Sequence, residues 1–189
     1  TLCATGIVCL YAVTFACNSI YHFEFFGPIP TFLLMALITG GAFLLAVRLG
    51  AQVVAVLGML GGFLTPVLLS SGRDNAIGLF SYIALLDVGL VALALHQRWL
   101  FLVPLGAAGT VAMQLGWASH YLSAARTPTA MIVCLVFCGV FLAAHLVSRK
   151  LGRTAPQLRW SALALACVAL LFALGFIGYR TIAAQPALL

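Results

Sequence analysis

The sequence predicts an all-α fold, a polytopic transmembrane helix bundle of about seven spans. Of its 189 residues, 65% are hydrophobic and only 6% are charged, although charged residues make up about a quarter of an ordinary globular domain. One soluble core cannot bury so much apolar surface, so lipid must be the surrounding solvent. The apolar runs are continuous rather than alternating, which favours helices over a β-barrel.

Each predicted span is an apolar run of about 20 residues, the length that a helix needs to cross about 30 Å of hydrocarbon. The first run gives way to Pro28 and Pro30, which stop one helix and start the next. The third and fourth runs flank Ser-Gly-Arg-Asp-Asn at residues 71–75, and these residues favour turns and helix caps. Short polar loops separate the last three runs. The expected spans are residues 1–21, 30–47, 51–70, 77–94, 100–122, 129–147 and 160–178.

We expect residues 1–189 to form a single transmembrane domain. The chain begins at Thr1 and is apolar from its second residue. It therefore resembles a fragment of a longer polytopic protein, and we expect further spans of the same protein, together with the lipid bilayer, as its partners.

The positions of Lys and Arg predict the orientation in the membrane, because short cytoplasmic loops are enriched in both residues. One side collects six of the nine cations, which are Arg48, Arg98, Arg149, Lys150, Arg153 and Arg159. The opposite side has Arg73, Arg126 and Arg180. The amino end is therefore expected in the cytoplasm and the carboxyl end outside.

Charge and motifs exclude several classes of function. The net charge of +6 does not indicate a nucleic-acid partner, because the cations lie at the ends of apolar runs without aromatic residues between them. A retinal protein needs a lysine within a span, and the single lysine, Lys150, lies in a loop. No phosphate loop, nucleophile elbow or His-Glu-x-x-His motif is present. The six cysteines lie within apolar runs, so we expect no disulfide, metal or other cofactor.

The third span contains an unusual group of glycines followed by a proline. Pro66 has no N–H, so the carbonyl of Gly62 loses its helical partner and must find another donor. One interpretation is tight packing, in which Gly58 and Gly62 form a ridge against a neighbouring helix and Thr65 bonds back to its own helix. The other is a broken helix whose freed carbonyls line a substrate or ion site. In that hypothesis the binding residues are Gly61, Gly62, Thr65 and Pro66.

Asp87 is the only acid within a predicted span, about 15 Å along the fourth helix and therefore near the midplane. Acids at this depth are costly, so they face the protein interior and usually serve a function. Gly62 lies at a similar depth in the adjacent span, about 12 Å from the same surface. A protonated Asp87 would suit the orphan carbonyl as a donor, and an ionised one would bind a proton or cation. The alternative is a structural hydrogen bond.

A weaker candidate site lies on the expected outer face, where His22, Glu24 and His120 have side chains that suit acid–base chemistry or metal binding. Nothing in their spacing links them, so solvated interfacial residues are the competing interpretation.

Two segments resemble a known family. They are residues 61–72, Gly-Gly-Phe-Leu-Thr-Pro-Val-Leu-Leu-Ser-Ser-Gly, and residues 79–87, Leu-Phe-Ser-Tyr-Ile-Ala-Leu-Leu-Asp. Together they are similar to bacterial multi-pass membrane proteins of the domain of unknown function 2339 family, with a likeness that runs from the first span into the sixth. The resemblance implies a long polytopic protein in the bacterial cytoplasmic (inner) membrane and implies no particular activity.

Two functions remain open from the sequence. The first is a transporter-like or scaffold bundle with a polar site at mid-membrane for a small solute or ion. The second is a membrane enzyme or envelope-assembly component with its chemistry on outer loops. A purely structural subunit is a third possibility, and we favour the non-enzymatic classes because catalytic motifs are missing.

Overall fold

The computed structural model of the chain describes residues 2–19, 28–68, 75–121, 126–150, 152 and 156–183. These residues form seven helices and no strand, which confirms the all-α prediction. The helices are α1 (Leu2–Ser19), α2 (Pro28–Leu49), α3 (Gln52–Leu68), α4 (Ala76–Gln97), α5 (Leu102–Tyr121), α6 (Thr127–Lys150) and α7 (Pro156–Ala183). They follow the expected spans closely. The largest difference is at α7, which begins at a proline because proline suits the first helical position.

Four of the described helices are long and apolar enough to cross a membrane: Pro30–Leu49, Ala76–Gln97, Thr127–Lys150 and Pro156–Gly175. Two further apolar segments, Leu2–Cys17 and Gln52–Leu68, are shorter. Helix α5 has 20 residues, but it includes the polar side chains of Gln114, Ser119 and His120. The expectation of about seven crossings is therefore generous by this measure.

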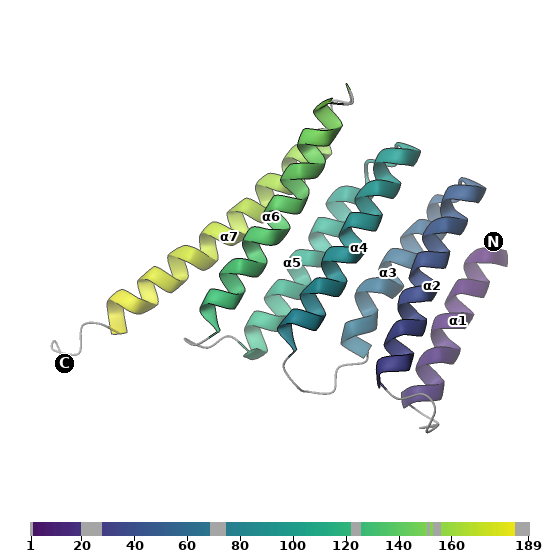
Figure 1. The fold of residues 1–189 in the computed structure, drawn as a ribbon, viewed down its shortest axis with the longest axis horizontal. Helices are drawn as coiled ribbons and strands as arrows, with labels where there is room; N and C mark the ends of the chain where they lie inside the picture. Colours follow the sequence, from purple (N-terminus) through teal and green to yellow (C-terminus); the bar gives the residue numbers. More distant parts are fainter. Residues whose placement is uncertain are drawn as a thin grey trace. The chain divides into compact units, whose positions relative to one another are not determined.

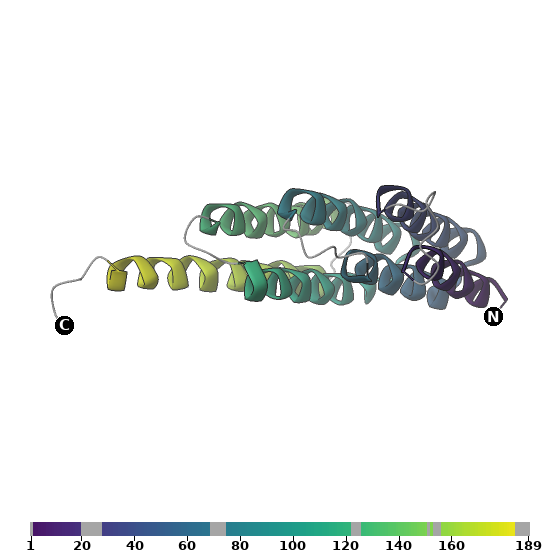
Figure 2. The ribbon, with the colours of Figure 1, turned by 90° about the horizontal axis from the view of Figure 1, so that it is seen from below.

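The chain forms two compact units, Thr1–Leu102 and Val103–Leu189. In the first unit, α2 and α4 lie in one layer and α1 and α3 in another (Figures 1 and 2). Helices α2 and α3 each contact the other three helices of this unit. The single transmembrane domain expected over residues 1–189 stays a prediction.

The turn between α2 and α3 is tight because of a glycine. Gly50 has a φ of 61°, and the Ala51 N–H donates a hydrogen bond to the Ala46 carbonyl over 3.1 Å. This is the Schellman arrangement, in which a left-handed residue just past the helix end is usually glycine. The short turn lets α2 and α3 pack closely through small buried side chains such as Ala42 and Ala55.

Helix α4 is buried on two faces. One face presents Tyr82 and Leu86, and the other presents Ile83, Asp87 and Leu90. Tyr82 and Asp87 are five residues apart, which places them about 140° apart around a helix of 3.6 residues per turn. Asp87 therefore points to a different side of α4 from Tyr82.

The start of α4 is capped as the sequence predicted. The side-chain oxygen of Asn75 accepts a hydrogen bond from the Gly78 N–H over 3.0 Å. Replacing Asn75 by alanine removes this acceptor, and we expect the free energy of unfolding to fall by about 1 kcal/mol. Unfolding in mixed SDS–detergent micelles measures the change. Asn75→Ser keeps an acceptor and is the control, so equal losses in both variants would contradict the cap.

In the second unit, α6 and α7 pack against each other. Gly152, in the linker between them, has a φ of 68°, which suits glycine because it has no Cβ. The buried side chains of α6 recur every three or four residues, which is the spacing of one helix face. They are Thr127, Ala130, Cys134, Phe137, Phe141, Ala144 and Ser148.

Candidate functional site

Four hydroxyl side chains, one from each helix of the first unit, surround the glycines of α3. We call them the hydroxyl cluster: Tyr11 of α1, Thr39 of α2, Thr65 of α3 and Tyr82 of α4. The Tyr11 and Thr39 hydroxyl oxygens are 2.5 Å apart. The Tyr11 hydroxyl also donates to the Gly58 carbonyl of α3 over 3.5 Å, and the Tyr82 hydroxyl bonds to a carbonyl of the same helix. The cluster therefore links all four helices through polar contacts, which are scarce in a chain this apolar.

The Gly62 carbonyl, freed by the proline, does find a donor. Pro66 lies within α3, and the Tyr82 hydroxyl donates a buried hydrogen bond to the Gly62 carbonyl over 3.1 Å. The Tyr82 ring packs against Phe32 of α2, with ring centroids 4.7 Å apart. We considered Asp87 as the donor on grounds of depth, and the structure assigns this role to Tyr82 instead. Asp87 lies about 140° farther round α4.

Each hydroxyl of the cluster donates its hydrogen to an acceptor within the protein. Thr39 donates to the Met35 carbonyl over 2.9 Å, and Thr65 donates to the Gly61 carbonyl over 2.8 Å. A hydroxyl has one hydrogen, so Thr39 accepts its bond from Tyr11. Tyr82 donates to Gly62, as described above. The hydroxyl cluster thus fixes the helices to one another and has no spare donor for a solute.

The glycines of α3 permit close approach of three neighbouring helices. A Cβ added at Gly58 would lie 2.7 Å from the Cβ of Ala42 on α2. One added at Gly61 would overlap the Tyr11 ring, and one at Gly62 would overlap Leu86. The predicted ridge of Gly58 and Gly62 is therefore confirmed, together with the back-bond of Thr65. Helix α3 is continuous from Gln52 to Leu68, so these observations favour packing over a broken helix.

Asp87 is fully buried, with 0% of its surface exposed. It is the only acid among the described residues. It lies 11 residues after the start of α4 at Ala76, which is about 16 Å along the helix and close to the middle of a hydrocarbon layer. The structure thus brings Gly61, Gly62 and Thr65 together on α3, and Asp87 lies on a different side of α4 from Tyr82, the donor to Gly62.

Three residues of the hydroxyl cluster were missed by sequence reasoning: Tyr11, Thr39 and Tyr82. A signal was available for the tyrosines. Tyrosine is enriched at membrane interfaces, but Tyr11 and Tyr82 lie well inside α1 and α4. A tyrosine at such depth needs a hydrogen-bond partner for its hydroxyl. Thr39 gave no comparable signal, because threonine often bonds back to its own helix.

The structure describes one of the three residues of the proposed outer-face site. His22 and Glu24 lie outside the described residues. His120 is exposed near the end of α5, and its ring centroid is 6.4 Å from that of Tyr121. Tyr121 in turn faces the guanidinium of Arg126 at 6.0 Å. These contacts are those of a polar helix end.

Comparison with known proteins identifies the family. The family model described as "Predicted membrane protein (DUF2339)" matches residues 1–189. This match confirms the resemblance seen at residues 61–72 and 79–87 and extends it over the seventh span. No curated protein and no solved structure matches the chain. The fold, the apolar helices and the family model agree, and the chain belongs to the DUF2339 family of membrane proteins.

Proposed function

We propose that this chain is a transporter-like bundle in which Asp87 takes up and releases a proton inside the membrane. The observation that carries the proposal is the complete burial of Asp87 near the middle of α4. Ionisable residues at this depth are expensive to keep, and they commonly mark ion or proton pathways. In the proposed step the carboxylate gains a proton at one oxygen and later returns it, and no other bond changes.

The hydroxyl cluster supports this role as a rigid frame. The bonds of Tyr11 to Thr39 and to the Gly58 carbonyl, and of Tyr82 to the Gly62 carbonyl, hold α1, α2, α3 and α4 together. A fixed frame keeps the face of α4 that includes Asp87 in a constant position. In this proposal Gly61, Gly62, Thr65 and Pro66 serve the frame rather than binding solute directly.

The proposed location is the bacterial inner membrane, with the amino end in the cytoplasm and the carboxyl end outside. Six of the nine cations fall on the side of Arg48 and Arg98. Arg48 lies in the last turn of α2, and Arg98 directly follows α4. The distribution of cations at the ends of apolar helices sets the orientation of the chain in the membrane. This charge asymmetry supports the proposed orientation, and the sequence resemblance supports the assignment to the bacterial inner membrane.

The test is proton flux through the full chain in liposomes. A potassium gradient with valinomycin sets a membrane potential, and a trapped pH-sensitive dye reports the initial rate of internal pH change. We expect the parent chain to exceed empty liposomes and Asp87→Asn to fall to the empty-liposome rate, because an amide cannot take up a proton. Asp87→Glu keeps the carboxyl and should retain part of the flux.

Ser81→Ala is the matched control, because Ser81 is an exposed hydroxyl on the same helix. Unchanged flux in Asp87→Asn, with normal insertion of the variant, would overturn the proton role. The chain would then be better explained as a scaffold. The full use of the cluster's donors within the protein already favours that second candidate function.

A further inference from the structure

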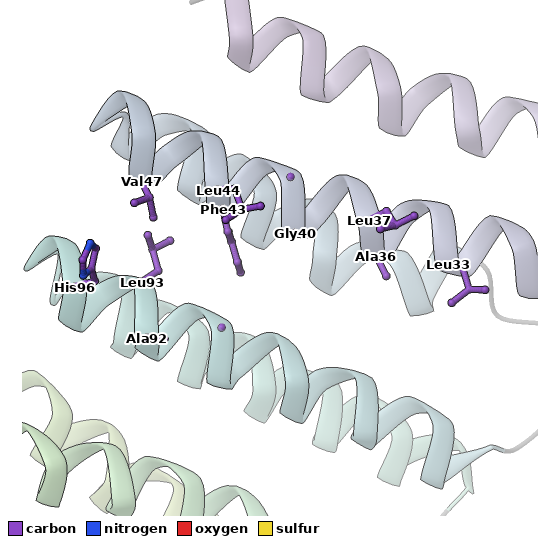
Figure 3. Close-up of a pocket in the computed structure, with 12 residues that line it drawn as sticks. Leu33, Ala36, Leu37, Gly40, Phe43, Leu44, Val47, Ala92, Leu93 and His96 are labelled. Carbon is purple, nitrogen blue, oxygen red and sulfur yellow. The ribbon is translucent and has the colours of Figure 1, made fainter.

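An apolar groove of about 1030 Å³ lies between α2 and α4. Figure 3 shows Val47 of α2 opposite Leu93 and His96 of α4, with Leu33 and Leu37 farther along α2. All these residues line the groove. It belongs entirely to the first unit and does not include the hydroxyl cluster.

Glycines make the groove deep. Gly40 and Gly41 line it, and a Cβ added at either position would meet nothing within 4 Å. On α4 the lining includes Gly89, where an added Cβ would only touch the Phe43 ring at 3.7 Å. The groove extends along α2 from Leu33 to Val47, which is about 21 Å of helix. One lipid leaflet contributes about 15 Å of hydrocarbon, so a single acyl chain fits this length.

One end of the groove is basic. His96 lines it there, Arg48 follows Val47 in the last turn of α2, and Arg98 follows the end of α4. Both arginine side chains are exposed. The only acid among the described residues is Asp87, about 16 Å along α4 from Arg98. The Gln97 side-chain amide donates to the Val47 carbonyl over 2.8 Å and so joins the two helices at this end.

We propose that this groove binds one acyl chain of an anionic phospholipid, with its phosphate at the basic end between Arg48, His96 and Arg98. The lining supplies apolar contact for the chain, and the two arginines supply complementary charge for the headgroup. Basic pockets between transmembrane helices bind anionic headgroups in this way. Another apolar helix in the groove would leave the cations at its end without a partner.

The test is native mass spectrometry of the full chain, delipidated in detergent and then titrated with phosphatidylglycerol or phosphatidylcholine. We expect tighter binding of phosphatidylglycerol, and a loss of about fivefold in its affinity for each of Arg48→Gln and Arg98→Gln. Gly40→Leu fills the groove and should weaken binding of both lipids. The matched controls are Gly116→Leu, which also enters open space, and Arg149→Gln, which removes an exposed cation elsewhere.

Three outcomes would overturn the proposal. They are equal affinity of the parent chain for the two lipids, equal losses in the groove variants and their controls, and a change from dimer to monomer on Gly40→Leu. The last outcome would assign the groove to a second copy of the chain. The open space at Gly40 means that Gly40→Leu should fold, and the arginine variants test the proposal independently.

Discussion

We expect the replacement of Gly58 by alanine to lower the free energy of unfolding by about 1–3 kcal/mol, because overpacking a close-packed core is destabilising by about this amount. The added Cβ would lie 2.7 Å from the Cβ of Ala42, whereas carbon atoms in contact are about 3.5–4.0 Å apart. A Cβ is fixed to its backbone, so α2 and α3 must separate. Unfolding in mixed SDS–detergent micelles, followed by tryptophan fluorescence, measures the loss.

Two further variants test the cause of this loss. Gly41→Ala is the matched control, because its Cβ enters open space and alanine favours a helix by up to about 1 kcal/mol over glycine. It should be neutral or stabilising. Ala42→Gly removes the atom that the new methyl meets, so combining it with Gly58→Ala should recover part of the stability. If the loss of stability in the double variant equals the sum of the losses in the two single variants, the proposed clash is contradicted.

Replacing Tyr82 by phenylalanine should lower the free energy of unfolding by about 1 kcal/mol. The change removes the donor to the Gly62 carbonyl and leaves a buried acceptor without its partner, which costs about 1–3 kcal/mol in soluble proteins. Hydrogen bonds within membranes average about 0.6 kcal/mol, so the expected value lies between these figures. The same unfolding assay applies.

A double-mutant cycle with Pro66 tests the reason for this loss. Pro66→Ala restores the N–H that a helix offers to the carbonyl four residues earlier, which is that of Gly62. Tyr82→Phe should therefore cost less in the Pro66→Ala background, with a coupling of at least about 0.5 kcal/mol. Tyr11→Phe is the control, because its bond to Thr39 does not involve this carbonyl. Equal costs of Tyr82→Phe in both backgrounds would refute the explanation.

The helices were predictable because their signals are local. Apolar runs of about 20 residues, broken by proline, glycine and a capping asparagine, give seven helices whose ends differ from expectation by a few residues. The end of α2 depends on Gly50 and the cap of α4 on Asn75. Glycine is common just past the end of a helix, and asparagine is common at the N-cap.

The partners across helices were harder to predict, because they depend on rotation about each helix axis. In a water-soluble protein the polar face of a helix reveals that rotation, but a helix in lipid is apolar on most sides. Depth alone made Asp87 a candidate partner for Gly62. The structure places Tyr82 and Leu86 there instead, on a face that the sequence does not distinguish from the one with Asp87.

The bond between Tyr82 and Gly62 has a consequence for biogenesis. Helix α3 emerges from the ribosome before Tyr82 does, and Pro66 deprives its backbone of one internal bond. Lipid supplies no donor for that carbonyl. We therefore expect α3 to remain at the insertion machinery until α4 arrives, so that the two helices are released into the bilayer as a pair.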